Sequence, residues 1–564
     1  MLRQLDEHIM KNRLHVIGWL LLALTSFGRG QTCNTATNWC GPYNPPSSSN
    51  VGVAAFNSTP PVASSQNTWG MTANDINATY GAGAAHADVV PNGAVGMNQF
   101  LEYADYYVQA YDKATGYPIF STTQQGIPGP QPAVHAWNLG SGQCQPGSID
   151  TVVAHDQVNS RWVLSNTSNA ATDDFLCIAV SQGEDLLNAS GGYQSLWNEY
   201  AFDLSTIVNI HTGLAPDIAD YPRFGTFGSG ANGYYYVTFD LINTQHAAKT
   251  YGLEGFAVCQ IPQAPLLQGT AASATCYRYV IPAAQLNHHP SLIHTLLPAD
   301  AESNSFATGT AGEYFLATEN PNIQTSDHLA FWTWRMIAHE RAPINILVKT
   351  FTPGCFDLTA LENTFCVPEP DSTTFIDGLG DRLMSRLAYR NLAGGETLAV
   401  TQTIAASTSK RFGKTQVRYY TLLAGAHPKV QHQGQFVDPS LFYFMPSNAI
   451  DQNGVVGYTF TGSLNTTYPE LYLDTLSAAG VPGTATVVPG LLFTGSENGS
   501  PTDKNQYWGE YVSTTIDPVD NLTFWSTGGY YQKDQIGCTL GAGWAGCNWY
   551  TAIFSCTKGG ANCQ

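Results

Sequence analysis

Short runs of alternating hydrophobic and polar positions fill most of the chain, and the clearest is the stretch from Gly380 to Thr403. Taken alone, its first half fits two structures. It could be a helix that starts at Asp381 and stops at Gly394, or a β-strand whose successive side chains point to opposite faces. In the strand interpretation, Gly394-Gly395 closes a hairpin onto a β-favouring run that starts at Thr397.

The same plan recurs along the chain, and the repetition decides between the two structures. Each copy is a short apolar or mixed strand, a turn built on Asp, Asn or Gly, and a second strand rich in aromatic and β-branched residues. A helix at residue 381 would break this series. Most copies start roughly 60 to 80 residues apart, which leaves room for two further strands and suits four-stranded blades. The copies start at Val95, Ser148, Asp220, Ser303, Gly380, Ser447 and Gly509.

These features predict an all-β protein, a six- or seven-bladed β-propeller, with an array of β-sandwiches as the structural alternative. Composition agrees, because charged residues are only 12% of the chain while Gly (54) and Tyr (29) are abundant. No Rossmann or P-loop glycine signature follows a predicted strand, so nucleotide binding is not expected.

The N-terminus indicates export. A polar start is followed by a largely apolar run from Leu14 to Phe27, which is short for a membrane span. We assign residues 1–30 to a signal peptide or an uncleaved anchor. Residues 31–88 are predicted to be a low-complexity arm rich in Pro, Ser, Asn and Gly, and residues 89–564 the propeller.

Charge and cysteine content narrow the compartment and the partners. A net charge of −19 repels phosphate backbones, so nucleic acid is not an expected partner. Twelve cysteines in an exported chain indicate disulfides, and a zinc site is disfavoured because no CxxC pair accompanies them. Neighbours in sequence suggest six bridges, although other connectivities exist: Cys33–Cys40, Cys144–Cys177, Cys259–Cys276, Cys355–Cys366, Cys538–Cys547 and Cys556–Cys563.

Several segments together resemble a family of large, exported, functionally uncharacterised bacterial proteins with a sialidase-like β-propeller. The resemblance implies fold and export, and no reaction. Two acidic motifs depart from the family's pattern, at residues 147–150 and 507–511, which puts a family-wide ion site in doubt. The similar segments include PNGAVGMNQFLEY at Pro91, VVAHDQVNSRWVLSN at Val152, ADYPRFG at Ala219, LGDRLMSRLAYRN at Leu379, SNAIDQNGVVGYTFTGS at Ser447 and YWGEYVSTTIDPVDNLTFW at Tyr507.

Ionisable residues stand just before the first apolar strand of several copies. If that strand is the innermost of each blade, these groups gather at one mouth of the central channel and form a candidate ligand site. The alternative is that they tie adjacent blades together, as buried charges must be paired. The predicted site consists of Asp150, Asp220, Tyr221, Arg223, Asp381, Arg382, Trp508, Glu510 and Tyr511.

Sialidase chemistry requires three arginines that converge on one carboxylate, with a Tyr nucleophile. Arg382, Arg386 and Arg390 cannot supply them, because four residues of strand span roughly 13 Å. A triad would need Arg223 and Arg382 joined by a third arginine from another blade, such as Arg335 or Arg418. A two-carboxylate glycosidase could instead use two of Asp150, Asp220, Asp381 and Glu510.

The sequence therefore predicts a secreted or envelope-tethered, disulfide-stapled, monomeric propeller that binds glycan or cell-surface protein at its channel mouth. A sialidase-like glycoside hydrolase and a structural envelope protein are the alternatives. No cofactor or metal is expected; the Asp517–Asp520 turn is the nearest candidate for structural calcium but lacks the ligand density of a calcium loop. Membrane contact is expected only through an uncleaved N-terminal anchor.

Overall fold

The computed structural model describes two short N-terminal strands and most of the chain from Asn67 to Thr557. The predicted signal, residues 1–30, lies outside the described residues. The described residues are 33–34, 39–40, 67–81, 84, 90–104, 106–120, 129–137, 139, 143–144, 150–169, 174–187, 192–207, 217–228, 232–243, 253–280, 292–293, 295–303, 306–307, 312–320, 326–357, 362–363, 365–370, 375–406, 414–477, 490–493, 512–531 and 549–557.

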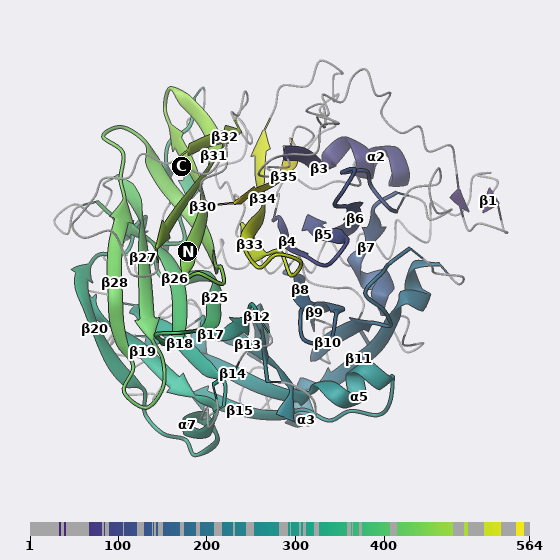
Figure 1. Cartoon of the computed structure of the whole chain (residues 1–564), viewed down its shortest axis with the longest axis horizontal. Coiled ribbons are helices and arrows are strands. Elements are labelled where there is room, and N and C mark those ends of the chain that lie inside the picture. The colour runs from purple at the N-terminus through teal and green to yellow at the C-terminus, as the bar shows by residue number, and fades with distance from the viewer. Residues whose placement is uncertain are drawn as a thin grey trace.

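Seven four-stranded blades, counted over the described residues, stand around a common centre (Figure 1). Five are separate sheets, and the other two are joined in one nine-stranded sheet. The predicted propeller is therefore confirmed, with seven blades.

The strands of the blades follow one another in chain order, with one exception in the last blade. Blades 1 to 3 are β4 (Asn92–Val95), β5 (Gln99–Ala104), β6 (Tyr107–Asp112), β7 (Gln131–Pro132); β8 (Val152–Asp156), β9 (Arg161–Asn169), β10 (Asp174–Ser181), β11 (Trp197–Asp203); and β12 (Asp217–Phe227), β13 (Tyr234–Asn243), β14 (Leu253–Pro262), β15 (Thr275–Val280). Blades 4 and 5 are β17 (Leu297–Ala301), β18 (Tyr314–Asn320), β19 (Ser326–Thr333), β20 (Ile344–Phe351); and β25 (Leu383–Leu392), β26 (Gly395–Ala405), β27 (Thr415–Leu423), β28 (Lys429–Phe436). Blades 6 and 7 are β29 (Phe442–Ile450), β30 (Val455–Leu464), β31 (Thr467–Ser477), β32 (Gly490–Phe493); and β33 (Ser513–Ile516), β34 (Thr523–Tyr531), β35 (Trp549–Thr557), β3 (Asn67–Thr72).

The stretch from Gly380 to Thr403 forms the predicted hairpin, β25 and β26, and not a helix. The first strand of this blade is its innermost, because β25 runs parallel to β17 of the preceding blade, with Ala299 opposite Leu387. This pairing joins blades 4 and 5 into a single sheet. Residues ahead of β25 therefore lie at one end of the central channel.

The propeller closes with a strand from the N-terminal region. β3 pairs with β35 as the outermost strand of blade 7, so the purple and yellow ends of the fold meet (Figure 1). The helix α2 (Ala73–Tyr80) follows at once, and Thr72 caps it by accepting a hydrogen bond from the Asp75 N–H at 3.1 Å. Residues 67–80 therefore belong to the propeller, whereas the sequence pattern placed them in the loosely packed arm, residues 31–88.

Short helices and strands lie outside the seven blades. The apolar core lies between the blades. Cys355, Val367 and Ile376, which precede blade 5, pack with Met71 and Val512 in one cluster. The remaining elements are β1 (Cys33–Asn34), β2 (Trp39–Cys40), η1 (Ala133–Ala136), η2 (Tyr193–Leu196), α3 (Leu204–Ile207), α5 (Gln263–Gln268), β16 (Leu292–Ile293), α7 (Trp334–Ala338), β21 (Phe356–Asp357), β22 (Glu362–Asn363), β23 (Phe365–Val367) and β24 (Ile376–Asp377).

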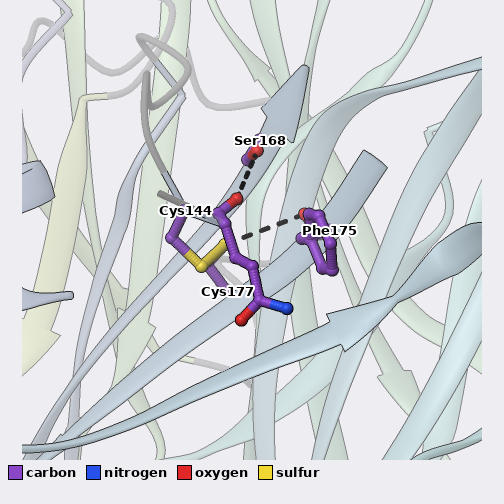
Figure 2. Close-up of a disulfide and its surroundings, with 5 residues drawn as sticks. Cys144, Ser168, Phe175 and Cys177 are labelled. Atoms are coloured by element: carbon purple, nitrogen blue, oxygen red, sulfur yellow. Dashed lines mark hydrogen bonds between the residues drawn. A yellow bond between two sulfur atoms is a disulfide. The ribbon is translucent and has the colours of Figure 1, made fainter. Parts of the chain in front are cut away.

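Three predicted disulfides are present, Cys144–Cys177 (Figure 2), Cys259–Cys276 and Cys355–Cys366. They indicate an oxidising, extracellular setting. Cys33 and Cys40 are register partners in the pairing of β1 with β2, but a bond between them stays a prediction. Cys556 is disulfide-bonded, while Cys538, Cys547 and Cys563 lie outside the described residues. Within the part of the chain described, none of the helices has the length and apolar character of a membrane span.

Candidate functional site

Residues from blades 3 and 5 meet around the aromatic ring of Tyr221 at the channel mouth. The register of β12 shifts between Asp220 and Arg223, and Tyr221 adopts a left-handed φ of 57° in this bulge. The Arg223 guanidinium carbon lies 3.4 Å from the Tyr221 ring centroid, and that of Arg382 lies 4.6 Å from it. The bulge therefore aims one ring at two cations, a stabilising arrangement in a desolvated site.

Arg382 is held in place by a second contact. Its Nε and Nη2 atoms donate hydrogen bonds of 2.8 and 3.1 Å to the two carboxylate oxygens of the buried Asp381. Burial opposes the charge of Arg382, but Asp381 and Tyr221 raise its pKa above the usual value. The third nitrogen, Nη1, donates no hydrogen bond to any described residue.

The other predicted mouth residues differ in where they lie. Asp220 is half-buried and accepts a hydrogen bond of 2.9 Å from the Tyr221 N–H, and Val90, just before blade 1, contacts Tyr221. Asp150 is buried directly before β8. The structure therefore brings together Asp220, Tyr221, Arg223, Asp381 and Arg382. Trp508, Glu510 and Tyr511 lie outside the described residues.

Asp377 is a mouth residue that the sequence analysis missed. Its Oδ1 accepts a hydrogen bond of 2.8 Å from the Leu379 N–H, and its side chain is buried. Burial and the charge of Asp381 raise the pKa of Asp377 to about 7, against the lowering effect of Arg382 and of backbone hydrogen bonds. Asp-Gly-Leu-Gly-Asp over 377–381 was the available signal, because Gly380 allows the backbone at Gly354 to approach closely and so places this acidic segment.

The arginines of β25 do not converge, as strand geometry predicted. Arg386 donates to Asp300 at 2.6 Å and to Glu302 at 3.0 Å, deeper in the channel. Arg390 donates to Asn521 Oδ1 at 2.9 Å. Arg386 and Arg390 therefore each tie blade 5 to other blades.

The two arginines proposed to complete a triad do not reach the mouth. Arg418 donates to the Lys349 carbonyl at 2.7 Å, between the outer strands of blades 4 and 5, and Arg335 is exposed on α7. Only Arg223 and Arg382, among the described arginines, are recorded against the Tyr221 ring. A sialidase-type arginine triad is therefore not formed by these residues.

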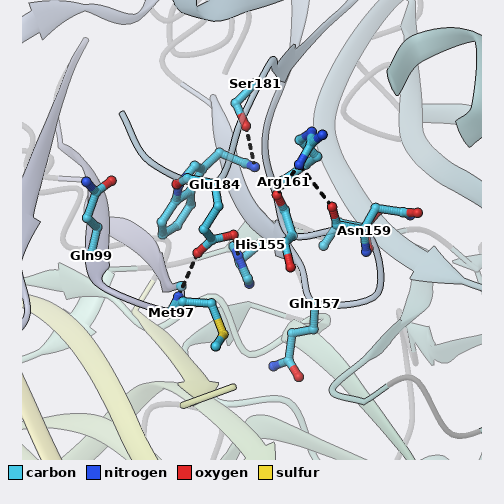
Figure 3. Close-up of polar contacts among 12 residues, drawn as sticks. Met97, Gln99, His155, Gln157, Asn159, Arg161, Ser181 and Glu184 are labelled. Carbon is cyan, nitrogen blue, oxygen red and sulfur yellow. Dashed lines mark hydrogen bonds and ion pairs between the residues drawn. The ribbon is translucent and has the colours of Figure 1, made fainter. Parts of the chain in front are cut away.

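His155 has a structural contact at the end of its strand (Figure 3). Its Nε2 lies 2.8 Å from Glu184 Oε2, while Glu184 Oε1 accepts the Met97 N–H at 2.7 Å. Burial acts to raise the pKa of Glu184, but His155 and this backbone hydrogen bond lower it overall. The carboxylate thus fastens the blade 1 turn to blade 2.

The Asp-rich turn of blade 7 is occupied by protein donors. Asp517 receives Lys113 Nζ and Trp525 Nε1 at 2.8 and 2.9 Å. Among the described residues, no three or more His, Cys, Asp or Glu side chains lie together where they could hold a metal ion.

Neither a family model nor a curated protein sequence matches the chain. Solved structures similar to it include an α-L-arabinofuranosidase from Podospora anserina in complex with cellotriose, with 8% identity, 74% of this chain and 93% of that chain covered, and a TM-score of 0.28. Another is the catalytic domain of a Coprinopsis cinerea GH62 α-L-arabinofuranosidase, with 9% identity, 84% of this chain and 98% of that chain covered, and a TM-score of 0.29. A third is a Trypanosoma rangeli sialidase mutant displaying trans-sialidase activity, with 10% identity, 73% of this chain and 54% of that chain covered, and a TM-score of 0.31. These identities and scores are too low to assign a function, and the propeller rests on the strand pairing described above.

Proposed function

We propose that the protein is an extracellular glycan-binding propeller whose ligand site is the channel mouth around Tyr221, Asp381 and Arg382. The observation that carries the proposal is that the Arg382 guanidinium is held in place while one of its nitrogens keeps a donor for a ligand. The ion pair with Asp381 and the ring of Tyr221 fix its guanidinium, and its Nη1 donates to no described residue. A donor held rigid before the ligand arrives costs little entropy on binding.

The neighbouring groups complement sugar chemistry. Asp220, next to Tyr221 in the chain, is half-buried and already accepts the Tyr221 N–H, so an acidic group stands near the two arginines that contact the Tyr221 ring. Sites of this kind combine aromatic walls with a few convergent polar groups. Binding at the mouth also agrees with the disulfides, which favour an extracellular protein.

A glycan array tests the proposal. The wild type should bind a restricted set of glycans, and an Asp381→Ala, Arg382→Ala double variant should lose that binding. Arg335→Ala, which removes an exposed arginine on α7, is the matched control and should bind like the wild type. Binding that survives the double change in a folded protein would place the site elsewhere.

Asp377 and Asp381 favour glycoside hydrolysis as a second candidate function. Their environments separate their roles, because the pKa of Asp377 is raised to about 7 while Arg382 pairs with Asp381. A protonated acid beside an ionised carboxylate is the pairing that glycoside hydrolysis uses. Aryl glycosides test it: turnover should fall at least a hundredfold in Asp377→Asn and in Asp381→Asn. No turnover by the wild type on a broad panel would leave binding alone.

A further inference from the structure

Arg382 can donate a hydrogen bond to a ligand, but its positive charge is already balanced. Its Nε and Nη2 atoms both donate to the carboxylate of Asp381, at 2.8 and 3.1 Å. Such a two-bond pair holds the two opposite charges against each other. The side chain keeps 15% of its surface exposed, and Nη1 donates to no described residue. A ligand therefore meets a hydrogen-bond donor at Arg382 without meeting an excess of positive charge.

Arg223, the other guanidinium at the Tyr221 ring, adds no exposed cation. The residue is only 2% exposed, and its guanidinium carbon lies 3.4 Å from the ring centroid. Its Nη1 donates to the Pro222 carbonyl at 3.1 Å. Arginines that recognise a ligand carboxylate commonly bind both of its oxygens. Among the described residues around Tyr221, Arg382 is the accessible guanidinium, and Asp381 already binds it.

Carboxyl groups outnumber guanidiniums around Tyr221. Asp240 is buried and lies opposite Asp220 in the pairing of β12 with β13. Burial opposes the charge of Arg382, but Asp381, Tyr221 and Asp240 raise its pKa, so Asp240 also acts on this cation. The described acidic and basic side chains of the mouth are Asp220, Asp240, Asp377 and Asp381 against Arg223 and Arg382.

Asp377 indicates how an additional acid behaves at this site. Burial and the charge of Asp381 raise its pKa to about 7, against the lowering effect of Arg382 and of backbone hydrogen bonds. The nearby guanidinium therefore does not fully compensate a second carboxylate. Even when Asp377 is protonated, the remaining carboxylates of the mouth outnumber its guanidiniums. A ligand carboxylate would add a further negative charge to this group.

We propose that the mouth selects glycans without carboxylate or sulfate groups and excludes sialic acids and uronic acids. This inference rests on the proposed glycan site and names its ligand class. A sugar hydroxyl can accept a hydrogen bond from Arg382 Nη1 and donate one to a carboxylate, and it brings no charge. An acidic ligand would instead compete with Asp381 for Arg382 and lose hydration beside other acids.

A glycan array printed in matched pairs tests the selectivity. Each neutral glycan stands beside its counterpart with a terminal sialic acid or uronic acid, and the apparent affinities of the wild type are compared. The acidic member should bind at least about tenfold more weakly, because like charges meet in a partly desolvated site. Acidic members that bind as tightly as the neutral ones would overturn the inference and leave glycan binding in place. Binding to neither member would contradict the glycan site itself, and the inference with it.

Salt separates charge repulsion from shape. Ions screen the repulsion between partly exposed charges, so the preference should shrink as sodium chloride is raised from about 0.05 to about 0.5 M. The affinity for the neutral members should change little. A preference that does not depend on salt would mean that the shape of the mouth excludes acidic sugars, which would overturn the assignment to charge.

An Asp381→Asn variant links the preference to the ion pair. The amide keeps the shape of the side chain but removes the charge that balances Arg382, so acidic members should gain about fivefold in affinity relative to neutral ones. Glu340→Gln, which removes one charge from an exposed turn, is the matched control and should keep the wild-type preference. Near-UV circular dichroism verifies that both variants are folded. An unchanged preference in folded Asp381→Asn would overturn the role of this ion pair.

Discussion

At the scale of single residues, carboxylates inside the fold act mainly as ties between blades. Glu102 of β5 is fully buried and accepts hydrogen bonds from the Met71 N–H at 2.8 Å and the Thr527 hydroxyl at 2.6 Å. Met71 and Thr527 belong to blade 7, so one side chain joins the first and last blades. Such ties are the structural role that the sequence offered as the alternative to ligand binding.

Glu102 should make the stability depend on pH. Burial raises its pKa to about 7, against the lowering effect of its hydrogen bonds. Its folded-state pKa therefore exceeds the unfolded value, so its contribution is complete below about pH 4 and is lost as the pH rises through about 7. Denaturant unfolding measures how much the free energy of unfolding falls between pH 5 and pH 8. This fall should be smaller in Glu102→Gln than in the wild type, by on the order of 2 kcal/mol. The control Glu340→Gln, on an exposed turn, should show the same fall in stability as the wild type. An equal fall in the wild type and both variants would contradict the role of Glu102.

Tyr221 should be important for the stability of the mouth through its ring and not through its hydroxyl. Tyr221→Ala removes the face that both guanidiniums contact and should cost about 3 kcal/mol in free energy of unfolding. Tyr221→Phe keeps the ring and should remain close to the wild type. Chemical unfolding measures both, and a Phe variant as unstable as the Ala variant would show that the hydroxyl carries the effect.

At the scale of elements, hairpins could be predicted from the sequence, whereas irregular backbone could not. The β25–β26 hairpin followed from alternation and from Gly394-Gly395, because these depend on local chemistry. The bulge of β12 did not, since an extra residue in a strand leaves the hydrophobic pattern almost unchanged. Asp377 was missed for a related reason: it stands outside the copied segments, in the two-residue strand β24, which pairs with β23 ahead of blade 5.

The disulfides Cys144–Cys177 and Cys259–Cys276 should differ in their contribution to stability. Cys144–Cys177 closes a separation of 33 residues and Cys259–Cys276 one of 17. Loop-closure entropy predicts that the longer loop stabilises more, by about 0.6 kcal/mol for each doubling. Paired Cys→Ala variants compared by denaturant unfolding should therefore lose more stability at 144/177. The reverse order would show that contacts around the bond dominate.

At the scale of the whole molecule, the ring is closed by pairing between chain regions far apart in sequence. Seven copies of one plan predicted the propeller, but the contribution of β3 to blade 7 was not predicted. Its composition is that of the preceding arm, and only β35, about 480 residues away, gives it a partner. The contacts around Tyr221 were likewise not predicted, because they join side chains of blades 3 and 5.

Removal of the closing strand tests this arrangement. A chain that begins at residue 73 lacks β3, so it exposes the edge of β35 and leaves Glu102 without the Met71 N–H. It should unfold at least 10 °C below a matched chain that begins at residue 66, in thermal melts followed by circular dichroism. Equal Tm values for the two chains would show that blade 7 is stable with three strands.

The central claim, glycan binding at the channel mouth, is tested most directly by a crystal structure of the protein with the glycan that the array selects. We predict sugar density in contact with Arg382 Nη1, beside Asp220 and over the entrance formed by β12 and β25. Density on the opposite face or the outer rim of the propeller, with the mouth empty, would contradict the claim.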